Sequence, residues 1–189
     1  MARKAAKAER LSIMLRYTVI TDFNGIAIFD PDRLIQFFGG QIAEGADLFT
    51  HFMSSDDGDK IVEQGIIIPI LAIDDGGYSV EFYVDEKSNR PKEQVVFENG
   101  VFPLCIEKRL VIADLVVLKE WIEGLGWIQV DVPPGYYKAT VRGFCERNRN
   151  GHITDCGYEV ILESTTSLPE PTASLDSNSR VMIPPTYDE

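Results

Sequence analysis

Short apolar runs separated by turn residues recur along most of this 189-residue chain. The clearest example spans residues 127–145, where Pro133-Pro134-Gly135 separates two runs whose apolar and polar side chains alternate. A period of two is typical of strands that bury one face of a sheet, and a Pro-Gly step suits a β-turn. This pattern predicts that the chain is mainly β.

Other segments repeat the pattern with different turns. Asn24-Gly25 predicts a hairpin or tight turn, and Pro69 inside an apolar run predicts a bulge or a sheet edge. Asp74-Asp75-Gly76-Gly77 and Lys108-Arg109 each precede a returning apolar segment, which predicts two successive hairpins of one sheet. The remaining strands are expected at residues 12–22, 26–29, 66–73, 78–84, 101–106, 110–114 and 158–162.

Helical signals are few. Asp30 is a favourable N-cap and Pro31 a favourable first residue for a short helix over residues 31–38, which Gly39-Gly40 ends. A brief helix or bulge is expected near residues 118–122, and residues 41–60 show no regular pattern. The fold class predicted is an antiparallel β-sandwich or a partly open barrel with one or two short helices.

Charge divides the chain into unequal parts. The 18 Lys and Arg residues against 30 Asp and Glu residues give a net charge of −12, yet residues 1–16 carry +4 and the remainder −16. We therefore expect a basic N-terminal arm over residues 1–11, a β domain over 12–163 and a Ser/Thr/Pro-rich tail over 164–189. Val181, Met182, Ile183 and Tyr187 are the expected apolar anchors of the tail.

An acidic body repels nucleic-acid phosphates and attracts basic surfaces, so a basic protein is the expected partner and nucleic acid is not. Two acidic loops are the candidate partner-binding sites. They contribute Asp56, Asp57, Asp59, Asp74 and Asp75.

Enzyme motifs are missing from the sequence. It contains neither a glycine-rich phosphate loop nor Gly-x-Ser-x-Gly. His152 lies near Asp155 and Cys156, but no protease signature surrounds them. His51 is the other histidine of the chain. We expect a protein that is not an enzyme and has no catalytic residues.

The sequence also predicts no metal site and no cofactor. The carboxylates of Asp56-Asp57-Gly58-Asp59 lack EF-hand spacing, and the three cysteines lack a Cys-x-x-Cys pair. Free thiols in a reducing cytosol are expected for Cys105, Cys145 and Cys156, with a Cys145–Cys156 bridge as the alternative.

The start of the chain predicts a cytoplasmic protein. Its apolar run is broken by Ser12 and Arg16 and is not followed by a small-residue cleavage site, so a signal peptide is not expected. No apolar stretch reaches the length needed to cross a membrane.

Two parts of the sequence carry a family resemblance. They run from Val95-Val96-Phe97-Glu98-Asn99-Gly100 to Arg109-Leu110-Val111-Ile112, and through Val130-Asp131-Val132-Pro133-Pro134-Gly135-Tyr136-Tyr137. This order of apolar strand, hairpin and Pro-x-Gly-x-Tyr turn resembles small bacterial proteins of the competence protein J type and related immunity-like β proteins. The resemblance spans residues 12–163 and implies an inhibitor that binds a nuclease without a cofactor. The basic arm and the tail depart from that pattern, and no functional residue carries over.

Two hypotheses follow. The first is a cytoplasmic inhibitor or immunity-type protein that binds a basic partner such as a nuclease. The alternative is a self-associating structural or ligand-binding β module, for instance a phage or assembly component, whose terminal segments form interchain arms.

Overall fold

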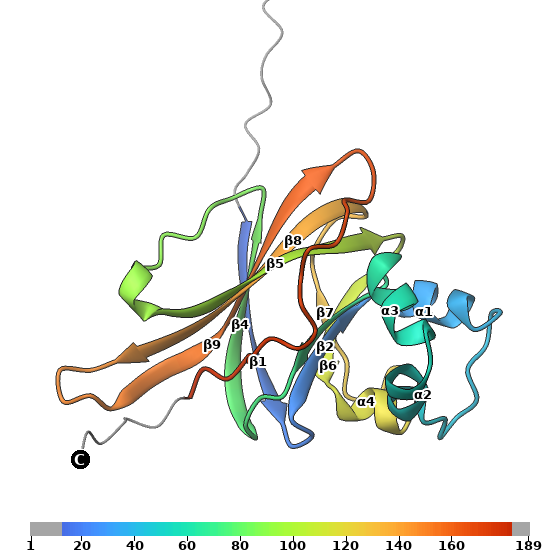
Figure 1. Ribbon diagram of the computed structural model, residues 1–189, viewed down its shortest axis with the longest axis horizontal. Coiled ribbons are helices and arrows are strands. Elements are labelled where there is room, and N and C mark those ends of the chain that lie inside the picture. Colours follow the sequence, from blue (N-terminus) through green and yellow to red (C-terminus); the bar gives the residue numbers. More distant parts are fainter. Residues whose placement is uncertain (1–12, 183–189) are drawn as a thin grey trace, which may run out of the picture.

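The computed structural model describes residues 13–182 as two packed β-sheets with helices beside one of them (Figure 1). Sheet A has the strand order β1-β4-β9-β8-β5 and sheet B the order β3-β2-β6-β7. The strands of sheet A are β1 (Ile13–Thr21), β4 (Gly76–Val84), β5 (Val95–Ile106), β8 (Gly135–Arg147) and β9 (Ile153–Thr165). Those of sheet B are β2 (Gly25–Phe29), β3 (Ile67–Leu71), β6 (Leu110–Asp114) and β7 (Ile128–Val130).

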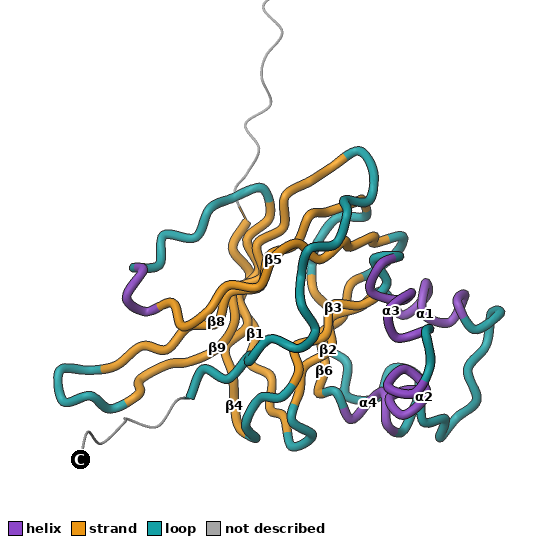
Figure 2. Tube along the Cα trace, viewed as in Figure 1, coloured by secondary structure: helices purple, strands orange, loops and turns teal. Residues whose placement is uncertain are grey.

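The helices gather on the side of sheet B that faces away from sheet A (Figure 2). The prediction of a mainly β, sandwich-like fold is confirmed, although residues 13–182 contain four short α-helices where one or two were expected. These are α1 (Pro31–Phe37), α2 (Leu48–Ser54), α3 (Asp57–Glu63) and α4 (Val116–Lys119), and a single 3₁₀ turn covers Lys92–Gln94.

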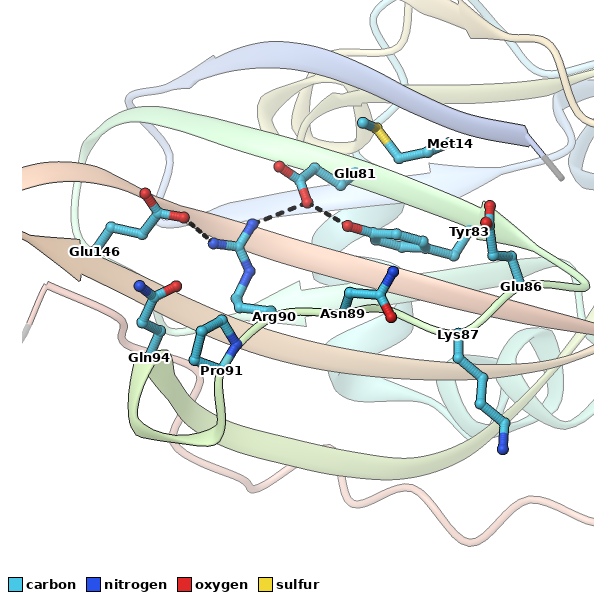
Figure 3. A pocket seen from close by; sticks show the side chains of 10 residues that line it. All are labelled: Met14, Glu81, Tyr83, Glu86, Lys87, Asn89, Arg90, Pro91, Gln94 and Glu146. Atoms are coloured by element: carbon cyan, nitrogen blue, oxygen red, sulfur yellow. Dashed lines mark hydrogen bonds and ion pairs between the residues drawn. The ribbon is translucent and has the colours of Figure 1, made fainter.

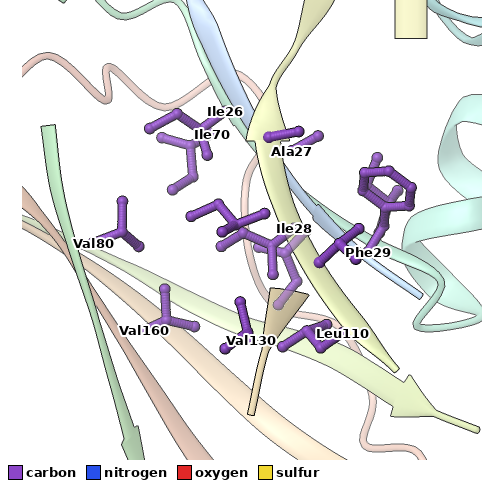
Figure 4. Packing of buried hydrophobic residues seen from close by; sticks show 14 of the residues in the cluster. Ile26, Ala27, Ile28, Phe29, Ile70, Val80, Leu110, Val130 and Val160 are labelled. Atoms are coloured by element: carbon purple, nitrogen blue, oxygen red, sulfur yellow. The ribbon is translucent and has the colours of Figure 1, made fainter. Parts of the chain in front are cut away.

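The core lies on both faces of β2, and every residue of that strand is buried. Ile26 and Ile28 point toward Val80 and Val160 of sheet A (Figure 4). Phe29 points the other way, and its ring centroid lies 6.3 Å from that of Trp121. Since period-two alternation places neighbouring side chains on opposite faces, a strand covered on both sides becomes continuously apolar.

The strand connections differ from the prediction. β3 and β4 belong to different sheets, as do β5 and β6, so the two expected hairpins of one sheet are wrong. Asn24, at a φ of 51°, does make a tight turn, but it carries the chain from sheet A to sheet B rather than into a hairpin. β8 and β9 form a true hairpin around Asn150-Gly151, and β4 pairs parallel to β9. Turn chemistry reverses the chain without deciding whether the next strand pairs with its predecessor or packs against it.

Two helices lie where the sequence showed no regular pattern. Asp47 caps α2 by accepting a hydrogen bond from the Thr50 backbone N–H at 2.8 Å. Asp56-Asp57-Gly58-Asp59, expected as an acidic loop, instead begins α3. The prediction at the other capped helix is confirmed, because Asp30 accepts from the N–H groups of Asp32 and Arg33 at the start of α1.

The tail packs along the side of the sandwich after β9 ends. Thr172 and Ala173 donate backbone hydrogen bonds to the Val101 carbonyl, and the Tyr158 hydroxyl donates to the Ser179 carbonyl. Val181 is buried, and a side chain at Gly143 would overlap it. Val181 and Met182 thus pack against the core as expected. Ile183, Tyr187 and the arm of residues 1–11 lie outside the described residues.

Candidate functional site

A cluster of charges covers the outer face of sheet A, which points away from sheet B. We call it the outer-face network. Glu81 on β4, Glu159 on β9 and Arg142 on β8 lie side by side because the strand register places them opposite one another. They alternate with core residues such as Val80, Phe82 and Val160, so the strand period turns them outward. The remaining members are Arg16, Arg90, Glu146 and Asp155.

Arg90 is the centre of this network (Figure 3). The loop between β4 and β5 brings it over the sheet, where its guanidinium lies 3.5 Å from the centroid of the Phe144 ring. It donates to Glu81 at 2.9 Å, to Glu159 at 2.8 Å and to Glu146. Only 8% of the Arg90 side chain is exposed, and the Glu159 side chain is fully buried. Such buried carboxylates require a paired cation, since desolvation penalises an unpaired charge.

Arg16 and Arg142 extend the network toward the two edges of the sheet. Arg16 donates to Asp155 at 2.6 Å and to the Ser79 hydroxyl at 2.7 Å. Arg142 lies 3.4 Å from Glu159 and 3.5 Å from Glu98. The buried Arg142 Nε and Glu159 Oε2 have no hydrogen-bond partner within residues 13–182. Arg142 and Glu159 therefore interact as an ion pair and not through a hydrogen bond of these two atoms.

A cavity of about 390 Å³ opens beside Arg90 and is lined by Met14, Tyr83, Glu86 and Asn89 among others. Burial, and then the hydrogen bond from its hydroxyl to Glu81, raises the pKa of Tyr83 to about 12. The phenol therefore stays protonated at neutral pH. Because Glu81, Glu146 and Arg90 already bind one another, the chemistry of this cavity is that of a structural ion-pair network.

A second cavity is lined mainly by apolar side chains. It has a volume of about 380 Å³ and lies between α2, α3, α4, the edge strand β3 and the tail. We call it the acidic groove. Asp59 of α3 and Asp176 of the tail line it, and both are exposed. Its apolar lining consists of Phe49, Phe52, Met53, Ile61, Val62, Ile67, Pro69, Leu71, Leu115, Leu118 and Leu175.

Local hydrogen bonds hold the helices that form this groove. His51 Nε2 of α2 lies 2.8 Å from Asp57 Oδ2 of α3, and Lys60 Nζ donates to Asp57 Oδ1 at 2.8 Å. The hydrogen bond from Lys60, followed by that with His51, lowers the pKa of Asp57. Asp57 therefore connects α2 to α3 rather than facing a partner alone.

The structure divides the five predicted partner-binding residues between two places. Asp56, Asp57 and Asp59 lie together at the start of α3, beside the groove. Asp74 and Asp75 lie in the connection from β3 to β4. Asp74 is 3.3 Å from Arg180 Nε, and Asp75 accepts hydrogen bonds from Asn24. Asp56 and Asp59 are exposed and have no ion-pair partner among residues 13–182.

Sequence reasoning missed the apolar half of the groove and Asp176. The signal for α2 was present, because Leu48, Phe49, Phe52 and Met53 repeat at helical spacing after the Asp47 cap. Asp176 carried no such signal, since the fold of the tail places it beside residues more than a hundred positions away.

Neither a protein-family model nor a curated protein sequence matches the chain. Two solved structures are similar in fold.

The fold is similar to that of crocagin biosynthetic protein J. That structure, titled "Crocagin biosynthetic gene J", matches with a TM-score of 0.50 and 12% identity over 82% of this chain and 99% of the other. The second match is ComJ from Bacillus subtilis, an inhibitor of the DNA-degrading activity of NucA, with a TM-score of 0.48 and 12% identity. It covers 82% of this chain and all of ComJ.

The cysteines and histidines form no reactive cluster in the described residues. Cys145 and Cys156 are opposite each other on β8 and β9, and both are free thiols. Burial, and then the neighbouring Cys145, raises the pKa of Cys156 to about 11. Residues 13–182 contain no group of three or more His, Cys, Asp or Glu placed to hold a metal ion. Within the same span, no helix is both long and apolar enough to span a membrane.

Proposed function

We propose that this chain is an acidic binding protein and that its partner is a basic protein. The observation that carries the proposal is the acidic groove. Its apolar side chains lie beside carboxylates that form no ion pair with a cation among residues 13–182. Elsewhere most described cations already sit in ion pairs, as Arg90, Lys108 and Lys119 do. Unpaired exposed carboxylates accelerate and select the approach of a basic surface.

Inhibition is the role that we assign to this binding. The strands and turns that resemble competence protein J-type proteins supply the reason for naming a nuclease as the basic partner. An inhibitor needs a complementary surface and no catalytic group of its own. We place the protein in the cytoplasm and assign it no cofactor.

A pull-down from the native host tests the proposal. The full chain, immobilised through a tag, should capture a basic protein at low salt and release it as salt rises, since screening weakens exposed charge pairs. Capture of acidic proteins alone, or of none, would contradict it. A stable oligomer of the purified chain in light scattering, lost when residues 1–11 or 164–189 are removed, would favour the self-associating module instead.

A further inference from the structure

We propose that the acidic groove binds a short extended segment of the basic partner. An apolar side chain of that segment enters the groove, Lys or Arg side chains flank it beside Asp59 and Asp176, and its backbone follows the edge of β3. This inference rests on the proposed function and specifies where and how the partner is recognised.

The edge of β3 has backbone N–H and C=O groups that point away from sheet B. The Leu115 N–H donates to the Gly25 carbonyl at 2.9 Å, so Gly25 and alternate residues of β2 direct their backbone groups toward β6. The intervening Ile26 and Ile28 therefore bond to β3, opposite Ile70 and Ile68.

Pro69 and Leu71, which alternate with those residues, direct their backbone groups away from β2. The Pro69 carbonyl and the Leu71 N–H and carbonyl have no hydrogen bond from the rest of the described chain. Pro69 has no N–H to leave unpaired, and this proline and the short strand make the edge too limited for sheet-to-sheet aggregation. Three groups are enough to orient a short segment, because added strands bind through main-chain hydrogen bonds while pockets select their side chains.

The groove supplies the selective pocket. Pro69 and Leu71 line it themselves, so a segment along this edge would place its side chains against the same apolar lining. Met53 is 67% exposed and lines the groove. Flexible methionines adapt to the shape of a bound apolar group. Burial of that group would supply the binding energy that surface charges alone do not.

Charge identifies the occupant as basic. Asp59 and Asp176 line the groove, and Asp56 precedes α3. Lys60 is the nearest cation of α3, and it is already paired with Asp57 at 2.8 Å. An acidic segment would meet uncompensated carboxylates, whereas a segment with Lys or Arg beside its apolar residue would neutralise them.

The first experiment uses defined peptides with the full chain. The probe is the acetylated, amidated peptide Lys-Leu-Arg-Phe-Lys, and binding is followed by the NMR signals of the Met53 and Leu118 methyl groups. Saturable shifts at both are expected. A peptide with alanine in place of Leu and Phe should bind at least tenfold more weakly, and one with glutamate in place of the cations should not shift them. Equal shifts with all three peptides would overturn the proposal.

Matched variants then separate the groove from general acidity. Asp59→Lys with Asp176→Lys should weaken peptide binding at least tenfold. Asp131→Lys with Glu93→Lys, which changes two exposed carboxylates outside the groove lining, should leave it within about twofold. Met53→Ser should weaken binding, while Leu125→Ser, at a similarly exposed position, should not. Equal losses in variant and control would overturn the proposal.

The same variants distinguish this inference from the proposed function. If a basic host protein is captured equally by the wild type and by the Asp59→Lys, Asp176→Lys variant, the groove assignment fails and the function stands. If no basic protein is captured and the peptide does not bind, both fail. An increase in peptide affinity on removing residues 1–11 would show that the chain's own basic arm occupies the groove, which would overturn the assignment to a partner.

Discussion

The outer-face network and the acidic groove hold carboxylates in contrasting surroundings. In the network, Glu81 and Glu159 are buried and bonded to Arg90, which is nearly buried itself. Beside the groove, Asp56 and Asp59 are exposed, and residues 13–182 offer them no ion-pair partner. The net charge of −12 therefore includes two kinds of carboxylate, those that are buried in ion pairs and those that are exposed without an ion pair.

The difference follows from solvation. A buried carboxylate without a cation costs several kcal/mol, so the network must be complete for the fold to be stable. An exposed carboxylate remains hydrated at little cost, and it stays available to a partner. Stability should accordingly depend on the network and binding on the groove.

The largest effect is expected from Arg90→Ala. This change leaves Glu81 and Glu159 buried without their cation, and loss of one partner from a buried pair costs about 3–5 kcal/mol. Urea unfolding would measure the free energy. Lys92→Ala, an exposed change in the same connection, should stay within about 0.5 kcal/mol of wild type. A loss from Arg90→Ala as small as that of the control would remove the contrast between the two regions.

The pKa of Tyr83 should report the charge of the network. Burial and the hydrogen bond to Glu81 raise it to about 12. Glu81→Gln removes a negative charge that disfavours the phenolate, so the pKa should fall, while burial keeps it above the ordinary value of about 10. Rapid alkaline pH jumps followed by tyrosine absorbance would measure it, with Tyr83→Phe to assign the signal. An unchanged pKa would show that Glu81 does not act on Tyr83 as a charge.

On the groove side, acid should weaken the cap of α2. The hydrogen bond from Lys119, and then that from the Thr50 N–H, holds the pKa of Asp47 at about 2, below its usual 3.8. A carboxylate with a lowered pKa in the folded state contributes stability above its unfolded pKa, and this is lost as pH falls from about 4 to about 2. Urea midpoints across that range should fall less steeply in Asp47→Asn than in wild type. Parallel curves would contradict the prediction.

The smallest effect on stability is expected at the groove carboxylates. Asp59→Lys with Asp176→Lys changes exposed side chains and should alter the free energy of unfolding by no more than about 0.5 kcal/mol per substitution. Thermal or urea unfolding beside the Arg90→Ala variant would check it. A loss comparable to that of Arg90→Ala would mean that these carboxylates are structural, and the functional contrast would disappear.

Local signals were sufficient for several elements of the fold. Asp30-Pro31 predicted α1 and its cap, and the strand expected at residues 78–84 lies within β4. Of the two settings predicted for Pro69, a bulge or a sheet edge, the sheet edge is confirmed. Each of these features depends on residues within a few positions of one another, so a sequence pattern is enough to predict it.

Only part of the candidate site could be predicted, because sequence patterns report on residues within a few positions of one another. The carboxylates of residues 56–59 stood out by composition, but the groove joins them to Leu71, Leu115 and Asp176 from three other segments. Arg90 gave no sign of its role, because its partners Glu81, Glu146 and Glu159 meet only when β4, β8 and β9 pair.

By itself, the sequence determined that this is an acidic, mainly β protein whose successive strands are separated by turns at Asn24-Gly25, Asp74-Asp75-Gly76-Gly77, Pro133-Pro134-Gly135 and Asn150-Gly151. These properties come from local backbone preferences and from charge. Only the tertiary structure decided which turns cross between the sheets, which carboxylates are neutralised within the fold and which remain beside an apolar groove. Those outcomes depend on pairing and burial between segments far apart in the chain, where no local preference operates.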